Sequence, residues 1–164
     1  MELNKIKSLP SSIVVFLLSL ITIILSQPDD SWLHVSVVVF WLIANNANFG
    51  IAFSSFSLKQ TVLVREVYIL QFIELCFTAI TNIFLFAYLY RVFGINTSCG
   101  DITHGLLDSI YFSIVTWTTL GYGDFSPTEV LRIPAAIEAL LGYTYMAILI
   151  GLLLTIFNRK PDAA

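Results

Sequence analysis

Long uncharged stretches alternate with short polar ones along the whole chain. Five runs carry no Asp, Glu, Lys or Arg: residues 8–28, 31–58, 75–90, 109–123 and 139–158, with lengths of 21, 28, 16, 15 and 20 residues. A helix of about 20 apolar residues spans the hydrocarbon core of a bilayer. The pattern therefore predicts an all-α membrane protein with four transmembrane helices, at about residues 9–26, 32–53, 67–90 and 133–157.

A shorter apolar segment, residues 102–118, lies between the third and fourth predicted helices. It is too short to reach the other membrane surface, so we expect a re-entrant helix that returns through residues 119–123. Irregular backbone at membrane depth is tolerated only where protein or a water-filled cavity surrounds it. The chain then divides into two peripheral helices (1–60), a unit that holds the re-entrant segment (61–158) and a short cytoplasmic tail (159–164).

The basic residues predict the orientation, because cytoplasmic loops close to membrane helices are enriched in Lys and Arg. Four crossings put six of the eight basic residues on one side and leave only Arg91 and Arg132 on the other. We therefore expect both termini in the cytoplasm of a multi-pass plasma-membrane protein. An alternative interpretation makes the first helix a cleaved signal peptide, but Ile24, three residues before the break after Ser26, is not small. The six residues on the predicted cytoplasmic side are Lys5, Lys7, Lys59, Arg65, Arg159 and Lys160.

Composition removes several classes of protein. The chain of 164 residues is 57% hydrophobic and only 12% charged, and its mean hydropathy is +0.86, whereas a soluble domain carries about 25% charged residues. The net charge of −3 and the lack of a basic patch also argue against nucleic-acid binding. A soluble enzyme and a disordered tail are excluded on the same grounds. Cys76 is expected to be a small buried hydrophobe, and Cys99 lies in a polar loop, where it could pair with its copy in another subunit.

The segment Thr116-Trp-Thr-Thr-Leu-Gly-Tyr-Gly-Asp124 resembles the selectivity filter of potassium channels. The likeness extends over residues 68–157: residues 108–113 look like the pore helix of that family, and Pro127 closes the filter exit. Residues 138–147 resemble the inner helix of small bacterial channels of this kind. The resemblance implies a homotetramer that conducts K⁺ passively, with K⁺ as the permeant ion and no organic cofactor.

The same residues suit ion coordination on physical grounds. Rings of carbonyl oxygens can replace the hydration shell of K⁺ if the backbone turns them all inward, and Gly121 and Gly123 adopt the required positive φ at little cost. We therefore expect the carbonyls of residues 119–122 to bind K⁺, with the Thr119 hydroxyl as the innermost ring. Leu120 and Tyr122 would then face outward into packing. The predicted filter consists of Thr119, Leu120, Gly121, Tyr122 and Gly123.

Several neighbours are expected to support the filter. Tyr111 and Tyr122 are suited to a rigid cuff, and the Asp124 carboxylate could accept a hydrogen bond from Tyr111 or from Trp117. Val115 stands where the family often has Glu, so a carboxyl pair behind the filter is not expected. The alternative is that residues 121–124 are merely a turn between two membrane helices. The proposed support set is Tyr111, Thr116, Trp117, Thr118, Asp124 and Glu138.

The fourth predicted helix offers candidates for gating. Gly142 is either a hinge or a close packing contact, and Gly151 is a second weak point. Helical spacing from Gly142 gives an apolar pore lining that could gate by dewetting. Two features depart from the family: Pro134, and the spacing between Pro127 and Gly142, which is one residue shorter than usual. The predicted lining residues are Tyr143, Met146, Ile150 and Leu154.

A carboxylate at membrane depth needs a partner, because unpaired polar groups in hydrocarbon are costly. Glu74 is predicted to lie level with Asn45, Asn46 and Asn48 of the second helix and to hydrogen-bond to them, which locks the peripheral helices to the pore unit. The alternative is that Glu74 senses protons. Glu138 is predicted to support the filter from behind.

Three functions remain open at this stage. The favoured one is a potassium-selective channel without an arginine-bearing voltage sensor or a C-terminal regulatory domain, gated by the pore itself, its lipid or an unidentified partner. The second is a non-conducting or modulatory subunit that needs a partner channel. The third is a cation transporter, although such proteins carry four pore repeats in one chain.

Overall fold

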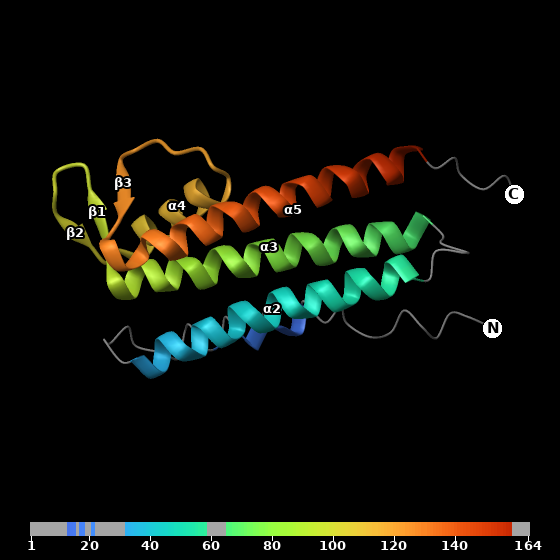
Figure 1. Ribbon diagram of the computed structural model, residues 1–164, viewed down its shortest axis with the longest axis horizontal. Helices are drawn as coiled ribbons and strands as arrows, with labels where there is room; N and C mark the ends of the chain where they lie inside the picture. The colour runs from blue at the N-terminus through green and yellow to red at the C-terminus, as the bar shows by residue number, and fades with distance from the viewer. Residues whose placement is uncertain (1–12, 16, 19–20, 22–31, 59–64, 159–164) are drawn as a thin grey trace, which may run out of the picture.

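Three long helices lie side by side and form most of the molecule (Figure 1). The computed structural model describes residues 13–15, 17–18, 21, 32–58 and 65–158. The helices are α2 (Trp32–Leu58), α3 (Arg65–Phe93) and α5 (Arg132–Asn158), and α3 runs antiparallel to the other two. Most of the first predicted helix (9–26) lies outside the described residues, but those of its residues that are described are helical.

Two of these helices are long and apolar enough to cross a membrane. They cover Tyr68–Phe93 and Glu129–Asn158, and Val35–Ile51 is a shorter apolar helix; these findings concern only the described part of the chain. Pro134 does not interrupt α5 because it lies in the first turn, where a backbone N–H has no helical acceptor. At the end of α3, Gly94 has a φ of +76°. Its N–H donates to the Tyr90 carbonyl at 2.9 Å, which is a standard left-handed helix stop.

A small sheet and a short helix occupy one end of the bundle. Helix α4 covers Leu106–Trp117, and the strands β1 (Ile95–Thr97), β2 (Ile102–Thr103) and β3 (Phe125–Pro127) are antiparallel in the order β2-β1-β3. The 3₁₀ turn η2 (Glu129–Leu131) leads from β3 into α5. The sheet was not predicted from the sequence.

The helix predicted over residues 102–118 is shorter than expected, because α4 covers only Leu106–Trp117. Its expected start at residue 102 is wrong, because Ile102 and Thr103 pair with β1 as strand β2. The Thr103 hydroxyl then donates to the Asp108 carboxylate at 2.8 Å and accepts from the Gly105 N–H at 3.1 Å. These bonds hold the chain extended until the helix begins at Leu106.

Two clusters of buried side chains hold the bundle together. The first lies at the sheet end, where Tyr90 of α3 packs with Phe112 of α4 and Leu131. The second contains Phe49 of α2, Leu75 of α3, Trp117 of α4 and Tyr145 of α5. Trp117 therefore brings the last turn of α4 into the core that the three long helices share.

Candidate functional site

The connection from α4 to β3 has a backbone that alternates in handedness. Thr119, Gly121 and Gly123 have φ values of +57°, +59° and +80°, whereas Leu120 and Tyr122 between them do not have positive φ. Left-handed conformations at every second residue turn successive peptide planes the same way, which a run of carbonyls needs in order to point to one side. The positive φ predicted for the two glycines is confirmed.

Thr119 was predicted as a ligand, but its left-handed backbone was not. It has the only positive φ among the non-glycine residues that the structure describes. A threonine held there costs about 1–3 kcal/mol relative to an ordinary backbone. The cost is offset by a Schellman motif: the N–H of Leu120 donates to the Val115 carbonyl and the N–H of Thr119 to the Thr116 carbonyl, each at 3.0 Å. Thr119 thus ends α4 and begins the alternating segment.

The far end of the segment is held by the sheet. Strand β3 follows Asp124 directly and pairs with β1 from Phe125 to Pro127. The Asn96 side-chain amide donates to the Pro127 carbonyl, and the Thr128 hydroxyl donates to the Gly94 carbonyl, both at 3.3 Å. The five residues 119–123 are therefore anchored to regular structure on both sides.

Aromatic side chains support the segment laterally. The rings of Tyr111 and Tyr122 stack with centroids 6.5 Å apart and planes 10° apart, and Phe125 meets Tyr111 edge-on at 5.8 Å. The Tyr111 hydroxyl lies near the Asp124 carboxylate and interacts with it. Of the two donors considered for Asp124, Tyr111 is thus beside it, and the hydrogen bond stays a prediction. Thr118 is the C-cap of α4, and its hydroxyl donates to the Ile114 carbonyl at 2.6 Å.

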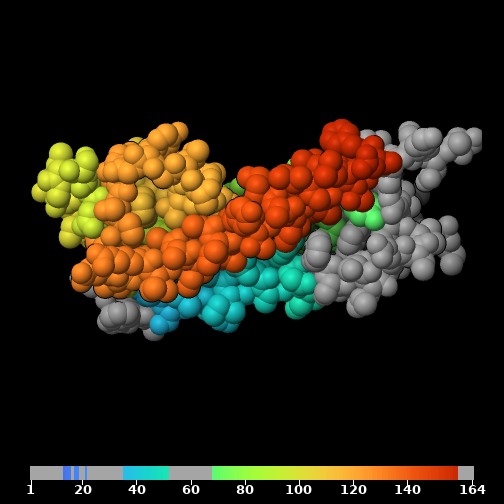
Figure 2. Space-filling model, turned by 45° about the horizontal axis from the view of Figure 1, so that its top comes forward, coloured from blue at the N-terminus to red at the C-terminus, as the bar shows by residue number. Residues whose placement is uncertain are grey.

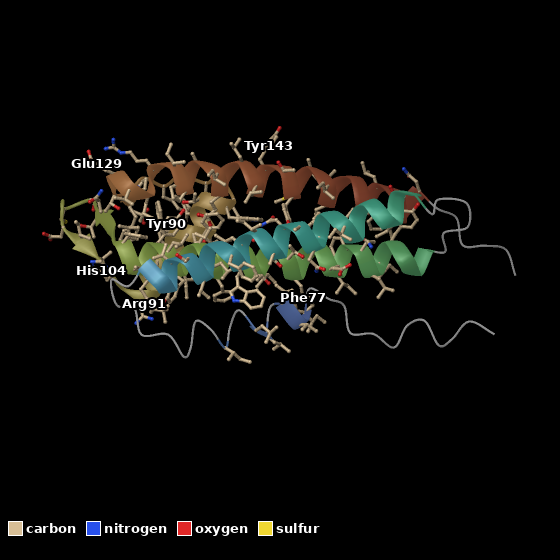
Figure 3. All side chains as sticks on the ribbon, turned by 60° about the horizontal axis from the view of Figure 1, so that its bottom comes forward. Phe77, Tyr90, Arg91, His104, Glu129 and Tyr143 are labelled. Carbon is tan, nitrogen blue, oxygen red and sulfur yellow. The ribbon has the colours of Figure 1, made fainter. Side chains whose placement is uncertain are left out.

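Glu138 is fully buried where α3, α4 and α5 meet. Its carboxyl group accepts a hydrogen bond from the Tyr90 hydroxyl, and its other oxygen lies 2.5 Å from the Ser113 hydroxyl. Ser113 also lies within hydrogen-bonding distance of the Ile83 carbonyl, at 2.8 Å. Figure 3 shows Tyr90 pointing into the space between the helices. Glu138, on α5, therefore links α4 to α3 and α5.

Gly142 is a packing contact between α5 and α4. It is buried, and a Cβ placed on it would lie 2.0 Å from the Trp117 carbonyl oxygen. One turn further along α5, the Tyr145 ring meets the Trp117 ring edge-on at 5.4 Å. Of the two interpretations of Gly142, the structure supports close packing. Around Gly151, in contrast, nothing lies within 4 Å of an added Cβ.

The predicted lining residues of α5 share an open face. Tyr143 points away from the other helices in Figure 3, and Figure 2 shows α5 along its length with the protruding α4–β3 region beside it. The exposed fractions are 74% for Tyr143, 48% for Met146, 51% for Ile150 and 58% for Leu154. This apolar face of α5 is available to contact another chain or to line a pore.

A polar cluster joins α2 to α3 and α5 near the middle of α2. Asn45 is fully buried and donates to the Thr78 carbonyl and to the Asn82 side chain, each at 3.1 Å. Asn46 and Asn82 bond to each other through their amides, at 3.1 and 3.3 Å. Sequence reasoning did not name Asn82, although its place on α3, opposite two asparagines of an antiparallel helix, was a usable signal. The bond from the Glu74 carboxylate to the asparagines stays a prediction.

Backbone oxygens are the candidates for holding a cation in this region. Among the residues that the structure describes, no group of His, Cys, Asp and Glu side chains could hold a metal ion. A cavity of about 290 Å³ is lined by Thr119, Gly121 and Gly123 together with residues of α4 and α5. In the single chain, residues 118–124 are exposed. The arrangement is that of a rigid strip of backbone that a partner surface or an ion can approach.

Comparison with known proteins identifies the family. A family model described as "Ion channel" matches residues 78–159, which is half of the chain. The chain belongs to this ion channel family. The matched region contains α4, the alternating segment and α5, and it leaves out α2 and residues 65–77 of α3.

The curated relatives agree with this assignment. Two-pore potassium channel 5 of Arabidopsis thaliana is 43% identical over 53 residues, which cover 32% of this chain and 13% of that protein. Two-pore potassium channel 2 of the same species is 39% identical over 54 residues, covering 32% and 12%. Two pore potassium channel c of Oryza sativa subsp. japonica is 32% identical over 82 residues, covering 44% and 18%. The chain spans less than a fifth of the length of these relatives.

The resemblance to the potassium channel family predicted from the filter motif is confirmed. The narrower resemblance to small bacterial channels is not supported by these matches, which are to plant proteins. No solved structure matches the chain. Membership of an ion channel family points to a role in ion transport in a membrane rather than to an enzyme.

Proposed function

We propose that four identical copies of this chain form a potassium-selective channel, with residues 119–123 of each copy as the selectivity filter. The observation that carries the proposal is the positive φ at Thr119, Gly121 and Gly123, in a segment anchored at both ends. The carbonyls of residues 119–122 coordinate K⁺, and the Thr119 hydroxyl supplies the innermost ring. Conduction is passive, with dehydrated ions in single file.

A tetramer follows from one filter segment per chain. A ring of oxygens around an ion needs several strands, and identical copies arranged about a cyclic axis supply them. The exposed face of α5, from Tyr143 to Leu154, then lines the inner pore, and its apolar side chains gate by dewetting. Helix α4 directs its C-terminal end, with a partial negative charge, toward the cation in the central cavity. Gly151 is the position where α5 can bend.

The membrane topology completes the proposal. Helices α2, α3 and α5, together with a first helix at about residues 9–26, cross the plasma membrane, and α4 is the re-entrant pore helix. The start of α3 and the end of α5 lie at the same end of the bundle, opposite the sheet (Figure 1). Arg65 begins α3 at that end, and Arg159 and Lys160 follow the last residue of α5 in the sequence, so the positive-inside rule makes this end cytoplasmic. The polar cluster of α2 and α3, extended by Glu74 and Asn48, braces the peripheral helices.

Purified protein in potassium-loaded liposomes tests the function. We expect a K⁺ flux that barium blocks, with little sodium permeation, and a mass of four chains for the detergent-solubilised particle. Protein-free liposomes prepared in parallel are the control for leak. A correctly folded tetramer without flux would favour the modulatory-subunit alternative, and equal K⁺ and Na⁺ fluxes would contradict the proposed filter.

A further inference from the structure

A buried hydroxyl group of the inner helix α5 bonds to the peripheral helix α2. The Tyr145 side chain is 6% exposed, and its hydroxyl donates to Asn46 Oδ1 at 2.8 Å. Its ring packs against Phe49, with centroids 5.2 Å apart. Tyr145 thus connects α5 to the face of α2 that carries Asn46 and Phe49.

The acceptor on α2 has a fixed orientation. The Asn46 amide donates to the Leu42 carbonyl at 2.8 Å and to Asn82 Oδ1 at 3.1 Å. Its oxygen accepts from the Asn82 amide at 3.3 Å as well as from Tyr145. An asparagine has two N–H donors and two lone pairs, and all four are used here. Asn46 therefore cannot turn toward or away from Tyr145 without losing other bonds.

The same tyrosine touches the base of the proposed filter. Its ring meets Trp117 edge-on at 5.4 Å, and Gly142, one turn earlier on α5, contacts the Trp117 backbone. Trp117 is separated from Thr119, where the left-handed backbone begins, by a single residue. A shift of α5 relative to α2 must therefore break the Tyr145–Asn46 bond or move Trp117.

We infer that Tyr145 is a positioning residue through which α2 holds the last turn of α4, and with it the filter, in the conducting arrangement. The inference rests on the proposed channel function and assigns a role in that function to α2. The strained backbone at Thr119 is kept in place by its surroundings. When the hydroxyl bond is lost, Trp117 loses a fixed lateral support, and the filter leaves the conducting state sooner.

Single-channel recordings of reconstituted protein test this role. Tyr145→Phe keeps the ring and its packing on Trp117 and removes only the bond to Asn46. One neutral hydrogen bond changes a rate roughly three- to tenfold, so we expect the mean open time to shorten by that factor. Asn46→Leu should shorten it at least as much. The double variant should not go beyond Asn46→Leu, because both substitutions remove the same bond.

Two controls separate positioning from simple stabilisation. Tyr88→Phe removes a buried hydroxyl of α3 that has no hydrogen-bond partner among the described residues and should leave the open time unchanged. The reversal potential with K⁺ and Na⁺ and the amount of tetramer on size exclusion should not change in Tyr145→Phe. A lower yield of tetramer with an unchanged open time would overturn the inference and leave Tyr145 a purely structural residue. Additive effects in the double variant would also overturn it, whereas absence of wild-type current would contradict the proposed channel function itself.

Discussion

The backbone of Trp117 lies directly against Gly142, so that a methyl group on the glycine would be 2.0 Å from the Trp117 carbonyl oxygen. Heavy atoms at that separation overlap, and the neighbour is backbone that cannot rotate away. The contact joins the end of α4 to the middle of α5. It also explains why this position of a long apolar helix carries a residue that is unfavourable for helix formation.

Gly142→Ala should destabilise the protein strongly. Overpacking a tight contact costs about 1–3 kcal/mol or more, and here α5 must move away from α4. We expect a clear fall in the thermal unfolding temperature of the detergent-solubilised protein, followed by tryptophan fluorescence. Gly151→Ala is the matched control: nothing lies near that position, so the melting temperature should stay level or rise. Equal behaviour of the two variants would contradict the packing interpretation.

Gly121→Ala should abolish selective conduction. An L-residue in the left-handed conformation costs about 1–2 kcal/mol, and a tetramer bears this cost four times. We expect at least a tenfold loss of K⁺ flux or a rise in Na⁺ permeation. Gly100→Ala is the control, because Gly100 also has a positive φ, +90°, but lies in an exposed turn with open space around it. It should conduct normally.

Two substitutions of Glu138 separate the contribution of its hydrogen bonds to stability from that of its size. Glu138→Leu leaves the buried Tyr90 hydroxyl without its partner, and one such unsatisfied group costs about 1–3 kcal/mol; Ser113 keeps only the Ile83 carbonyl. Glu138→Gln offers them an oxygen and an amide in the same place. We expect the leucine variant to melt at a clearly lower temperature and the glutamine variant to stay close to wild type. Glu129→Gln, at a side chain that is 88% exposed, should have no effect.

The predicted Tyr111–Asp124 bond should affect how long the filter stays open. Tyr111→Phe keeps the stack on Tyr122 and loses the hydrogen bond, and Asp124→Asn weakens the same bond from the other side. Both should shorten the single-channel open time, roughly two- to tenfold for one hydrogen bond. Indistinguishable open times in wild type and Tyr111→Phe would show that this bond does not support the proposed filter.

Glu74 offers a choice between bracing and sensing. If the carboxylate serves to hold α2 to α3, current recorded from pH 5 to pH 9 should depend on pH equally in wild type and in Glu74→Gln. Loss of pH dependence in the variant would establish the proton-sensing alternative. Asn82→Leu removes the partner of Asn46 and therefore tests the brace independently. The amount of assembled protein should fall in this variant, and the recorded current should fall in proportion.

Sequence reasoning reached furthest where one residue type has one physical use. The positive φ of Gly121 and Gly123 and the apolar length of α3 and α5 followed from the residues alone. The asparagines of α2 were placed in a polar cluster facing α3, and Glu138 was placed behind the filter segment. In each case the residue would be unfavourable in the alternative position: a glycine inside a helix, or an amide or carboxyl group facing hydrocarbon without a partner.

The remainder depended on contacts between segments distant in the chain. Strand β1 is three residues long, and its pairing with β3 is built by backbone groups that every residue has, so Ile95 and Asn96 carry no recognisable strand signal. Thr119 was predicted as a ligand, but its left-handed backbone was not, because threonine normally avoids it. Tyr145 looks like any core aromatic residue until Asn46 is found opposite its hydroxyl.

The Schellman motif at the end of α4 fixes the rotational phase of the filter. Because the Leu120 and Thr119 N–H groups bond to carbonyls in the last turn of the helix, the direction in which the first filter carbonyl points depends on where that turn stops. Each residue added to an α-helix rotates its end by about 100°. A one-residue insertion in α4 would therefore aim the proposed filter away from the pore axis without altering a single filter residue. In the proposed channel, the length of α4 is thus as much a part of ion selectivity as the glycines are.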